Sequence, residues 1–254
     1  MSTFEKVIEL VHETKKIILN PELRSEIYQK GASDFVTAVD TTVSSFMQTE
    51  LEKLFPEIGF MSEEGNNQHF KGNRWILDPI DGTTNLIFDY QLSSVSLGLL
   101  YNGEIVFGIV YNPFTDETFY AEKGKGAYLN NKRLTVSERD ISDSLIEFGA
   151  GSTRKNEADL TFQIAKEIFM DCIDIRRICS SALAISYIAA KRIDGYFQKV
   201  LKPWDYAAAL LILEEAGGSI SDWKGAKMQF EKPSSIIASN KRIHNYLLSK
   251  MPQL

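Results

Sequence analysis

The sequence predicts a mixed α/β protein made of two lobes that form one continuous structural unit. Helical and strand-like segments alternate up to about residue 92 and again after about residue 143, whereas residues 93–136 carry short strands joined by turns. No internal repeat, low-complexity tract or linker rich in proline and serine divides the chain. We therefore expect an N-terminal α+β lobe over residues 1–142 and a C-terminal α/β lobe over residues 143–254.

The N-terminal lobe is expected to begin with helices and short strands. Apolar residues at helical spacing predict one amphipathic helix over the first twenty residues and a second helix that ends before Pro56. Strand-like apolar runs are each followed by acidic side chains: 35–39 by Asp40, 58–61 by Glu63-Glu64, and 75–77 by Asp78. Because the strand ends of an open sheet converge in space, we expect these acids to lie together.

An antiparallel meander is predicted next, followed by renewed alternation in the C-terminal lobe. Asn102-Gly103 and Asn112-Pro113 are turn signals between the strand-like runs of the meander, which are 93–101, 104–111 and 118–121. The C-terminal lobe is expected to contain a strand over 144–148 and helices over 158–170, 181–191 and 206–216. Gly217-Gly218 ends the last helix, since glycine commonly follows a helix C-terminus.

Composition and charge exclude several classes of protein. The chain has 254 residues, 44% of them hydrophobic, which is enough to bury a substantial core. The net charge is −6 and no run of lysine or arginine occurs, so nucleic acid is not an expected partner. No apolar stretch approaches the roughly 20 residues that a membrane span needs, and acids interrupt the apolar pattern of the N-terminus. We therefore expect no membrane partner, no signal peptide and a cytoplasmic location.

The segment from Trp75 to Asn85, WILDPIDGTTN, carries the densest chemical information. Its apolar run stops at Asp78, and Asp81 follows beyond Pro79. Two carboxylates at a strand end destabilise a fold unless positive charge neutralises them, and a divalent cation is the simplest neutraliser. Capping of a short helix by Asp81 or Thr83 is the structural alternative, but capping does not account for Asp78. A metal beside a turn suited to holding an anion indicates phosphate chemistry.

Other residues narrow the type of chemistry. Asp205 precedes the last predicted helix, so it is expected to be that helix's N-cap, where it could also lie near an anion or a metal. Neither Cys172 nor Cys179 is followed six residues later by arginine, which excludes a cysteine phosphatase. In haloacid dehalogenase phosphatases the second aspartate is at position i+2, whereas Asp81 is at position i+3 relative to Asp78. Membership of that class of phosphatase is therefore disfavoured. An all-oxygen ligand set favours Mg²⁺ over Zn²⁺.

Taken together, these motifs resemble the inositol monophosphatase family of Mg²⁺-dependent, lithium-sensitive phosphatases, in order and over nearly the whole chain. The matching segments are Asp34–Asp40 (D-x-V-T-x-x-D), Glu63-Glu64 (paired glutamates), Trp75–Asn85 (W-I-x-D-P-[IL]-D-G-T-x-N), Gly124–Ala127 (G-x-G-A) and Trp204–Ala208 (W-D-x-A-A). The resemblance implies a layered αβαβα sandwich, a homodimer, two or three bound Mg²⁺ ions and a small phosphorylated substrate.

The resemblance also assigns roles to individual residues. The first Mg²⁺ would bind Glu63, Asp78 and the carbonyl of Ile80, and the second would bind Asp78, Asp81 and Asp205. The residues implied to contact the substrate are Asp81, Gly82, Thr83, Thr84, Ser180, Ser181, Gln198 and Asp205. Asp40 would bond to the hydroxyl of Thr83, and this pair with Glu63 would orient the attacking water.

Departures from the family pattern concern the leaving group of the substrate. The family's lysine before the first motif is matched only by Lys30, shifted by one residue, whose role the sequence leaves open. The family's Gly-[ST]-Ala-Ala stretch is here Cys179–Ala182, and its glutamate facing the ring hydroxyls is here Gln198.

The sequence thus predicts Mg²⁺-dependent hydrolysis of a small phosphate monoester by a metal-activated water, with an inositol monophosphate-type substrate. Fructose 1,6-bisphosphate, NADP and 3′-phosphoadenosine nucleotides remain alternative substrates. A non-catalytic regulatory protein that keeps the fold, and an oxygen-ligand metal-binding protein without a substrate, are the alternatives of another class.

Overall fold

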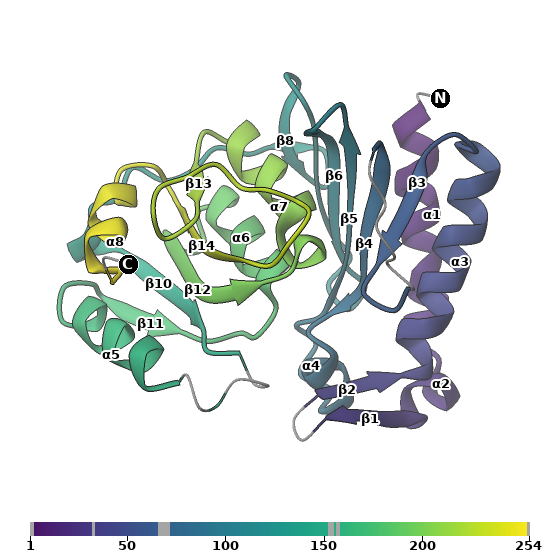
Figure 1. Cartoon of the computed structure of the whole chain (residues 1–254), viewed down its shortest axis with the longest axis horizontal. Coiled ribbons are helices and arrows are strands. Elements are labelled where there is room, and N and C mark those ends of the chain that lie inside the picture. Colours follow the sequence, from purple (N-terminus) through teal and green to yellow (C-terminus); the bar gives the residue numbers. More distant parts are fainter. Residues whose placement is uncertain (1–2, 32–33, 66–71, 152–154, 156–157, 253–254) are drawn as a thin grey trace.

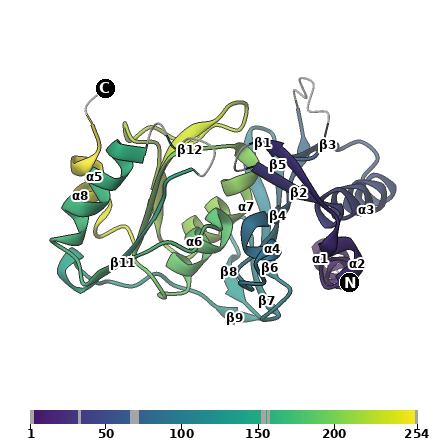
Figure 2. The ribbon, with the colours of Figure 1, turned by 90° about the horizontal axis from the view of Figure 1, so that it is seen from below.

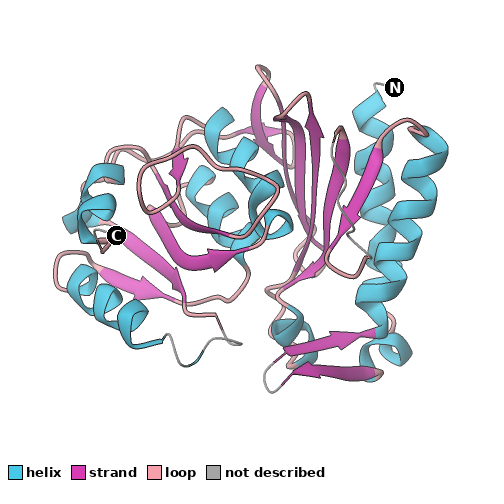
Figure 3. Ribbon diagram, viewed as in Figure 1, coloured by secondary structure: helices cyan, strands magenta, loops and turns pink. Residues whose placement is uncertain are grey.

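The helices and sheets of the chain stack in alternating layers, as Figures 1 and 3 show. The structure is a computed structural model in which residues 3–31, 34–65, 72–151, 155 and 158–252 are described. Among these residues the layers follow in the order α1 (Thr3–Ile18) with α3 (Ala38–Leu54), a seven-stranded sheet, α6 (Ser181–Ala189) with α7 (Pro203–Glu215), a five-stranded sheet, and α5 (Ala158–Phe169) with α8 (His244–Lys250). The predicted layered αβαβα sandwich is confirmed.

The first helical layer covers one face of the seven-stranded sheet. It consists of α1 (Thr3–Ile18) and α3 (Ala38–Leu54). Buried Val7 and Val11 of α1 and Met47 of α3 pack against Trp75 and Phe107 of the sheet. Complete removal of such side chains from water stabilises the layer by about 2 kcal/mol each. The helical spacing read from the sequence is therefore the spacing of the face that α1 and α3 bury.

The described strands of the larger sheet lie in the order β3-β4-β5-β6-β7-β8-β9. Their bounds are β3 (Gly59–Ser62), β4 (Arg74–Asp81), β5 (Ser94–Tyr101), β6 (Glu104–Asn112), β7 (Glu117–Glu122), β8 (Gly126–Leu129) and β9 (Lys132–Arg133). β3 runs parallel to β4, and every later pair is antiparallel, which confirms the predicted meander. The parallel pair brings the ends of β3 and β4, and hence their acids, to one edge.

The smaller sheet belongs to the later part of the chain and has the described order β11-β10-β12-β14-β13. Its strands are β10 (Leu145–Gly149), β11 (Asp174–Arg176), β12 (Gly195–Leu201), β13 (Ser219–Ser221) and β14 (Ser234–Ser239). β10 pairs in parallel with β11 and β12, whereas β14 is antiparallel to β12 and β13. Of these strands the sequence predicted only β10.

The central helices α6 (Ser181–Ala189) and α7 (Pro203–Glu215) lie between the two sheets, as the view from below in Figure 2 also shows. Their apolar side chains share one core with both sheets. The backbone of β6 approaches α7 so closely that a Cβ at Gly108 would lie 2.5 Å from the carbonyl oxygen of Ala208. Only glycine permits this contact, which fixes the middle of α7 against the larger sheet.

The remaining elements cover the edges and the outer face. The described ones are α2 (Pro21–Ser25), β1 (Ile27–Gly31), β2 (Asp34–Thr37), α4 (Thr83–Ile87), the 3₁₀ turn η1 (Ile141–Asp143), α5 (Ala158–Phe169) and α8 (His244–Lys250). α5 and α8 close the smaller sheet with a third apolar core. Among the described residues, every helix is too short or too polar to cross a membrane.

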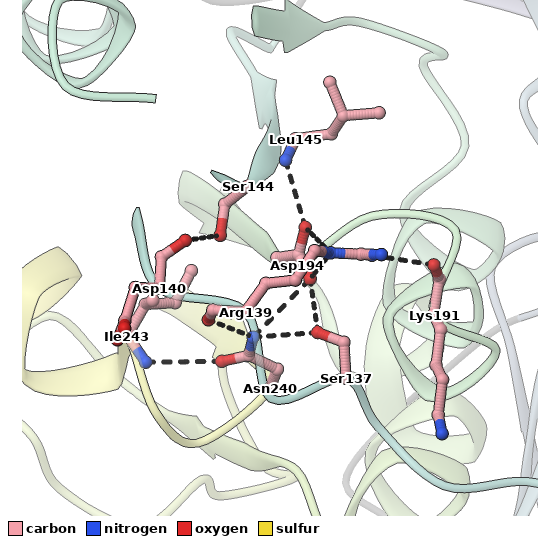
Figure 4. Close-up of polar contacts among 9 residues, drawn as sticks. All are labelled: Ser137, Arg139, Asp140, Ser144, Leu145, Lys191, Asp194, Asn240 and Ile243. Carbon is pink, nitrogen blue, oxygen red and sulfur yellow. Dashed lines mark hydrogen bonds and ion pairs between the residues drawn. The ribbon is translucent and has the colours of Figure 1, made fainter. Parts of the chain in front are cut away.

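A buried polar cluster around Asp194 joins three connections at one end of the smaller sheet (Figure 4). The carboxylate of Asp194 accepts hydrogen bonds from the hydroxyl of Ser137, from the guanidinium of Arg139 at 2.9 and 3.0 Å, and from the backbone N–H of Leu145 at 3.0 Å. The amide of Asn240 donates to Ser137 at 2.9 Å. The cluster therefore ties the segment before β10 to the starts of β12 and α8.

Several predicted element ends were wrong, and each has a local cause. Asp40 does not end a strand; it is the third residue of α3, where it accepts a hydrogen bond from the N–H of the N-cap Thr37 at 2.8 Å. Asp205 is likewise inside α7 rather than its N-cap, because α7 begins at Pro203. Neither Asp81 nor Thr83 caps α4, whose N-cap is Gly82.

Candidate active site

A cleft of about 670 Å³ opens where β4, α4, β10, β12 and the starts of α6 and α7 meet. Eleven of the residues that the sequence singled out line it: Glu63, Asp78, Ile80, Asp81, Gly82, Thr83, Thr84, Ser180, Ser181, Gln198 and Asp205. Asp40 reaches the cleft through its contact with Thr83. The structure thus brings these residues together from segments far apart in the sequence, while their individual roles stay predictions.

The acids of the cleft share a strongly unfavourable environment. Burial, followed by repulsion from neighbouring acids, raises the pKa of Glu63 to about 7 and that of Asp78 well above its usual range. Burial also raises the pKa of Asp205, and repulsion from Glu63 and Asp81 raises it further. These groups cannot all carry charge unless a cation joins them.

The donor set fits Mg²⁺, because it offers carboxylate oxygens together with the carbonyl oxygen of Ile80. Among the described residues, no group of three or more His, Cys, Asp or Glu side chains stands arranged to hold one ion. Asp81 is one reason why the acids do not converge on one point, since both of its oxygens accept hydrogen bonds at the start of α6. Binding therefore requires side-chain adjustment.

Asp81 is held by the start of α6. It accepts hydrogen bonds from the hydroxyl of Ser180 at 2.6 Å and from the N–H groups of Ser181 at 3.2 Å and Ala182 at 2.7 Å. Burial raises its pKa, and these bonds lower it again, leaving it at about 6. The hydroxyl of Ser180 is thus engaged with Asp81, and its predicted contact with substrate stays a prediction.

Asp40 and Thr83 form a second fixed pair. The hydroxyl of Thr83 lies 3.1 Å from Oδ1 of Asp40 and 3.1 Å from the carbonyl oxygen of Ile80, and it can donate to either. The other oxygen of Asp40 accepts from the hydroxyl of Thr37 at 2.6 Å. Because both available partners accept, the Thr83 oxygen keeps its lone pairs free for a group in the cleft.

Gly82 makes the turn between β4 and α4 possible. Its φ is +94°, and a Cβ there would lie 3.0 Å from the carbonyl oxygen of Leu92. Asn85 then locks the turn by donating to the carbonyls of Leu92 at 2.8 Å and Ile178 at 2.7 Å. The side chain of Asn85 therefore connects the turn at Gly82 to the segment that precedes α6.

Lys30 lies beside the cleft and binds Glu64, with distances of 2.5 and 2.6 Å from its Nζ to the two carboxylate oxygens. Its charge also lowers the pKa of Glu63, although less than burial and Glu64 raise it. Lys30 thus offsets part of the negative charge around Glu63. The sequence did not predict this contact, because Lys30 is offset by one residue from the lysine of the family motif.

Glu147 and Tyr196 are among the cleft residues that the sequence did not single out. Glu147 is 1% exposed, accepts a hydrogen bond from the N–H of Ile178 at 2.9 Å, and has its pKa raised to about 8 by burial. An acid that interrupts the apolar run Leu145–Phe148 was the signal that could have found it. Tyr196 carried no such signal, since a tyrosine in a strand is usually a core residue.

Comparison with known proteins gives a consistent result. The chain matches the model of the inositol monophosphatase family over residues 1–254. It is 37% identical over 223 residues to an inositol-1-monophosphatase of Rhizobium meliloti, covering 86% of this chain and 83% of that one. It is 36% identical over 232 residues to the Nus factor SuhB of Escherichia coli, covering 89% and 85%.

Solved structures agree with the sequence comparison. The Thermotoga maritima IMPase superposes with a TM-score of 0.90 at 30% identity and covers 99% of this chain and 97% of its own. Inositol monophosphatase II of Staphylococcus aureus, bound to inositol monophosphate, gives a TM-score of 0.83 at 25% identity with coverage of 98% and 93%. With the family match spanning the whole length, this chain belongs to the inositol monophosphatase family.

Proposed function

We propose that this protein is a Mg²⁺-dependent phosphomonoesterase that hydrolyses a small phosphorylated metabolite. The observation that carries the proposal is the cluster of buried acids Glu63, Asp78, Asp81 and Asp205, whose mutual repulsion calls for divalent cations. The cluster borders the Gly82–Thr83 turn, where a phosphate could accept hydrogen bonds from the backbone. Membership of a phosphatase family supports the proposal.

The residues of the cleft divide the reaction among them. Bound Mg²⁺, held by Glu63, Asp78, Ile80, Asp81 and Asp205 as two or three ions, would stabilise charge on the phosphate oxygens and lower the pKa of a water molecule. Thr83 directs its proton toward Asp40 or Ile80, so its oxygen accepts a hydrogen bond from the attacking water. The water oxygen would bond to phosphorus while the ester P–O bond breaks. One proton of the water would leave with the alcohol, and the other would stay on the phosphate product.

We further propose an inositol monophosphate-type substrate. Support comes from the relative named inositol-1-monophosphatase and from the S. aureus relative that binds inositol monophosphate. The same S. aureus protein also binds 2′AMP, at 26% identity to this chain, so nucleotides remain an alternative together with fructose 1,6-bisphosphate, NADP and 3′-phosphoadenosine nucleotides. Sensitivity to lithium and assembly into a homodimer are proposed on family membership alone.

A phosphate-release assay with Mg²⁺ tests the proposal. The panel contains inositol 1-phosphate, fructose 1,6-bisphosphate, NADP and 3′-phosphoadenosine 5′-phosphate. Chelation should abolish release, and Asp78→Asn should lower kcat by about three orders of magnitude or more, because a metal ligand and its charge are lost. Asp159→Asn, at an exposed position of α5, is the matched control. An Asp78→Asn rate near that of the wild type would refute the metal assignment.

A second candidate is a regulatory protein that has kept the fold without turnover. This regulatory alternative is motivated by the E. coli relative, which is named Nus factor SuhB. All the proposed metal-binding residues are present in this chain, however, which favours catalysis. Release at background for every substrate of the panel, at saturating Mg²⁺, would support the regulatory alternative.

A further inference from the structure

Besides its acids, the cleft contains a chain of neutral hydrogen bonds between α6 and β12. The hydroxyl oxygens of Ser181 and Tyr196 are 3.0 Å apart. The hydroxyl of Tyr196 donates to Oε1 of Gln198 at 2.6 Å, and Nε2 of Gln198 donates to the carbonyl of Val200 at 3.0 Å. Ser181 and Gln198 are partly exposed in the cleft, whereas Tyr196 is only 2% exposed and lies behind them.

The direction of the protons in this chain follows from its ends. A carbonyl at Val200 only accepts, so the amide nitrogen of Gln198 must face it and Oε1 must face Tyr196. The single proton of Tyr196 then goes to Gln198, and Ser181 must donate to Tyr196. What remains for a ligand is an acceptor, the lone pairs of Ser181, and a donor, the second N–H of Gln198.

Gly149 leaves the room in which this arrangement fits. On β10 it pairs in register with Gln198 of β12. A Cβ at Gly149 would lie 1.6 Å from Oε1 of Gln198 and 2.9 Å from the hydroxyl of Tyr196. Any side chain at this position must therefore displace the carboxamide. The backbone of Gly149 is outside the left-handed region, so a side chain at this position is opposed by the carboxamide of Gln198 and not by backbone conformation.

We propose that Tyr196 is a positioning residue for substrate selection, which fixes Ser181 and Gln198 so that they receive a leaving group carrying further hydroxyl groups. The proposal rests on the proposed phosphomonoesterase function, because the phosphate is assigned to the acidic part of the same cleft. A hydroxyl both donates and accepts, so a polyol can satisfy the acceptor of Ser181 and the donor of Gln198 together. An alcohol without further hydroxyls leaves both groups unpaired, at a cost in affinity.

The test compares inositol 1-phosphate with phenyl phosphate, which has no further hydroxyl. Tyr196→Phe removes the hydroxyl that orders both partners. KM for inositol 1-phosphate should rise about three- to tenfold, the loss expected for neutral hydrogen bonds, whereas kcat and the phenyl phosphate constants should stay unchanged. Gly149→Ala should produce the same selective loss through displacement of Gln198. A thermal melt establishes that both variants are folded.

The matched control is Tyr111→Phe. Tyr111 is also 2% exposed, and its hydroxyl donates to Asp116 at 2.9 Å, away from the cleft. It should leave the ratio of the two KM values unchanged. An unchanged ratio in Tyr196→Phe, or an equal loss for both substrates, would overturn the proposed role of Tyr196.

Calorimetric titration separates this proposal from the proposed function. If the wild type hydrolyses neither compound, the phosphatase proposal fails, and the dissociation constants of the two phosphates in wild type and Tyr196→Phe still decide the role of Tyr196. A selective loss of inositol 1-phosphate affinity would support that role. If the wild type binds neither compound, both proposals fall.

Discussion

At the scale of residues, the acids of the cleft show how hydrogen bonds and burial compete. Asp78 and Asp81 are both buried, with exposed fractions of 2% and 8%. Asp81 accepts three hydrogen bonds, from Ser180 and the first two residues of α6, and keeps a pKa of about 6. Among the described residues Asp78 accepts one, from the N–H of Ile80, and its pKa is well above its usual range. The start of α6 therefore makes Asp81 the more easily ionised of the two.

The Thr83 hydroxyl should be required for turnover. Thr83→Ala removes the oxygen that we propose accepts a hydrogen bond from the attacking water, so kcat should fall by about 10²- to 10⁴-fold. Thr83→Ser keeps that oxygen and should retain most of the rate. Steady-state phosphate release at saturating Mg²⁺ measures both, with the exposed Thr115→Ala as control. A Thr83→Ala rate within twofold of the wild type would contradict the assigned role.

Glu147 should make stability depend on pH. Its pKa rises from the ordinary 4.5 to about 8 on folding, so the folded state favours the protonated carboxyl. The contribution of Glu147 to folding stability is therefore fully present below pH 4.5 and is lost as the pH rises through 8. Glu147→Gln keeps the acceptor for Ile178 and cannot ionise. The free energy of unfolding of Glu147→Gln, relative to that of the wild type, should therefore increase by on the order of 4 kcal/mol between pH 5 and pH 8.5.

Urea unfolding at several pH values measures this difference, and Glu138→Gln at an exposed position is the control. A difference between Glu147→Gln and wild type that stays constant with pH would disprove the raised pKa. Burial accounts for the direction of the shift, and the carboxyl oxygen Oε2 of Glu147 has no hydrogen-bond partner among the described residues to offset it.

At the scale of elements, the Asp194 cluster should stabilise the smaller sheet without contributing to catalysis. Asp194→Ala leaves Arg139, Ser137 and the N–H of Leu145 without their acceptor, and should lower the free energy of unfolding by about 3 kcal/mol. No member of the cluster lines the described part of the cleft, so kcat per folded molecule should persist. Urea unfolding of Asp194→Ala, with Asp171→Asn at an exposed position as the control, measures the loss in free energy of unfolding. A loss smaller than that of the control would refute the prediction.

Sequence patterns located elements that carry their own signal and missed elements whose burial depends on their neighbours. The long helix α3 has apolar residues at helical spacing, and the meander strands β5 and β6 are apolar runs separated by the turn signal Asn102-Gly103; all three were predicted. β12 was missed because its segment, Gly195–Leu201, mixes buried aromatic residues with Gln198 and Lys199 and shows no alternation. Only pairing with β10 and β14 makes it a strand.

The same distinction applies to the site. Motifs that carry charge, such as Asp78 and Asp81 after the apolar run Trp75–Leu77, could be found from the sequence because charge in a buried strand is unusual. The predicted strand end before Asp78 was wrong, since β4 pairs with β5 as far as Asp81. The contact of Tyr196 with Gln198 depends on the absence of a side chain at Gly149 across the sheet, which only the register of β10 and β12 reveals. The division of the chain at residue 142 remains a prediction.

At the scale of the whole molecule, Mg²⁺ should stabilise the folded chain. Cations bound at the proposed site would relieve the repulsion among acids supplied by β4, α7 and the segment after β3. At a hundredfold excess over the dissociation constant, one ion adds about 2.7 kcal/mol, which corresponds to a rise in Tm of about 6 °C for a chain of this size. A thermal melt with and without Mg²⁺ at pH 8 measures the rise.

Protons should compete with the metal in the same experiment. The pKa of Glu63 is about 7 and that of Asp81 about 6, so the Mg²⁺-dependent rise in Tm should shrink when the pH falls to 5. Asp78→Asn should abolish the rise at both pH values. An equal rise in this variant would show that the ion stabilises the protein elsewhere.

The position of α7 between the two sheets has a consequence for protein synthesis. Glu63, Asp78 and Asp81 leave the ribosome long before the segments that complete their surroundings, namely the start of α6, which binds Asp81, and Asp205 on α7. During this interval the growing chain carries acids without their hydrogen-bond donors or their fourth carboxylate. The proposed metal site is therefore completed late, and on refolding the binding of Mg²⁺ should appear after the secondary structure of the larger sheet.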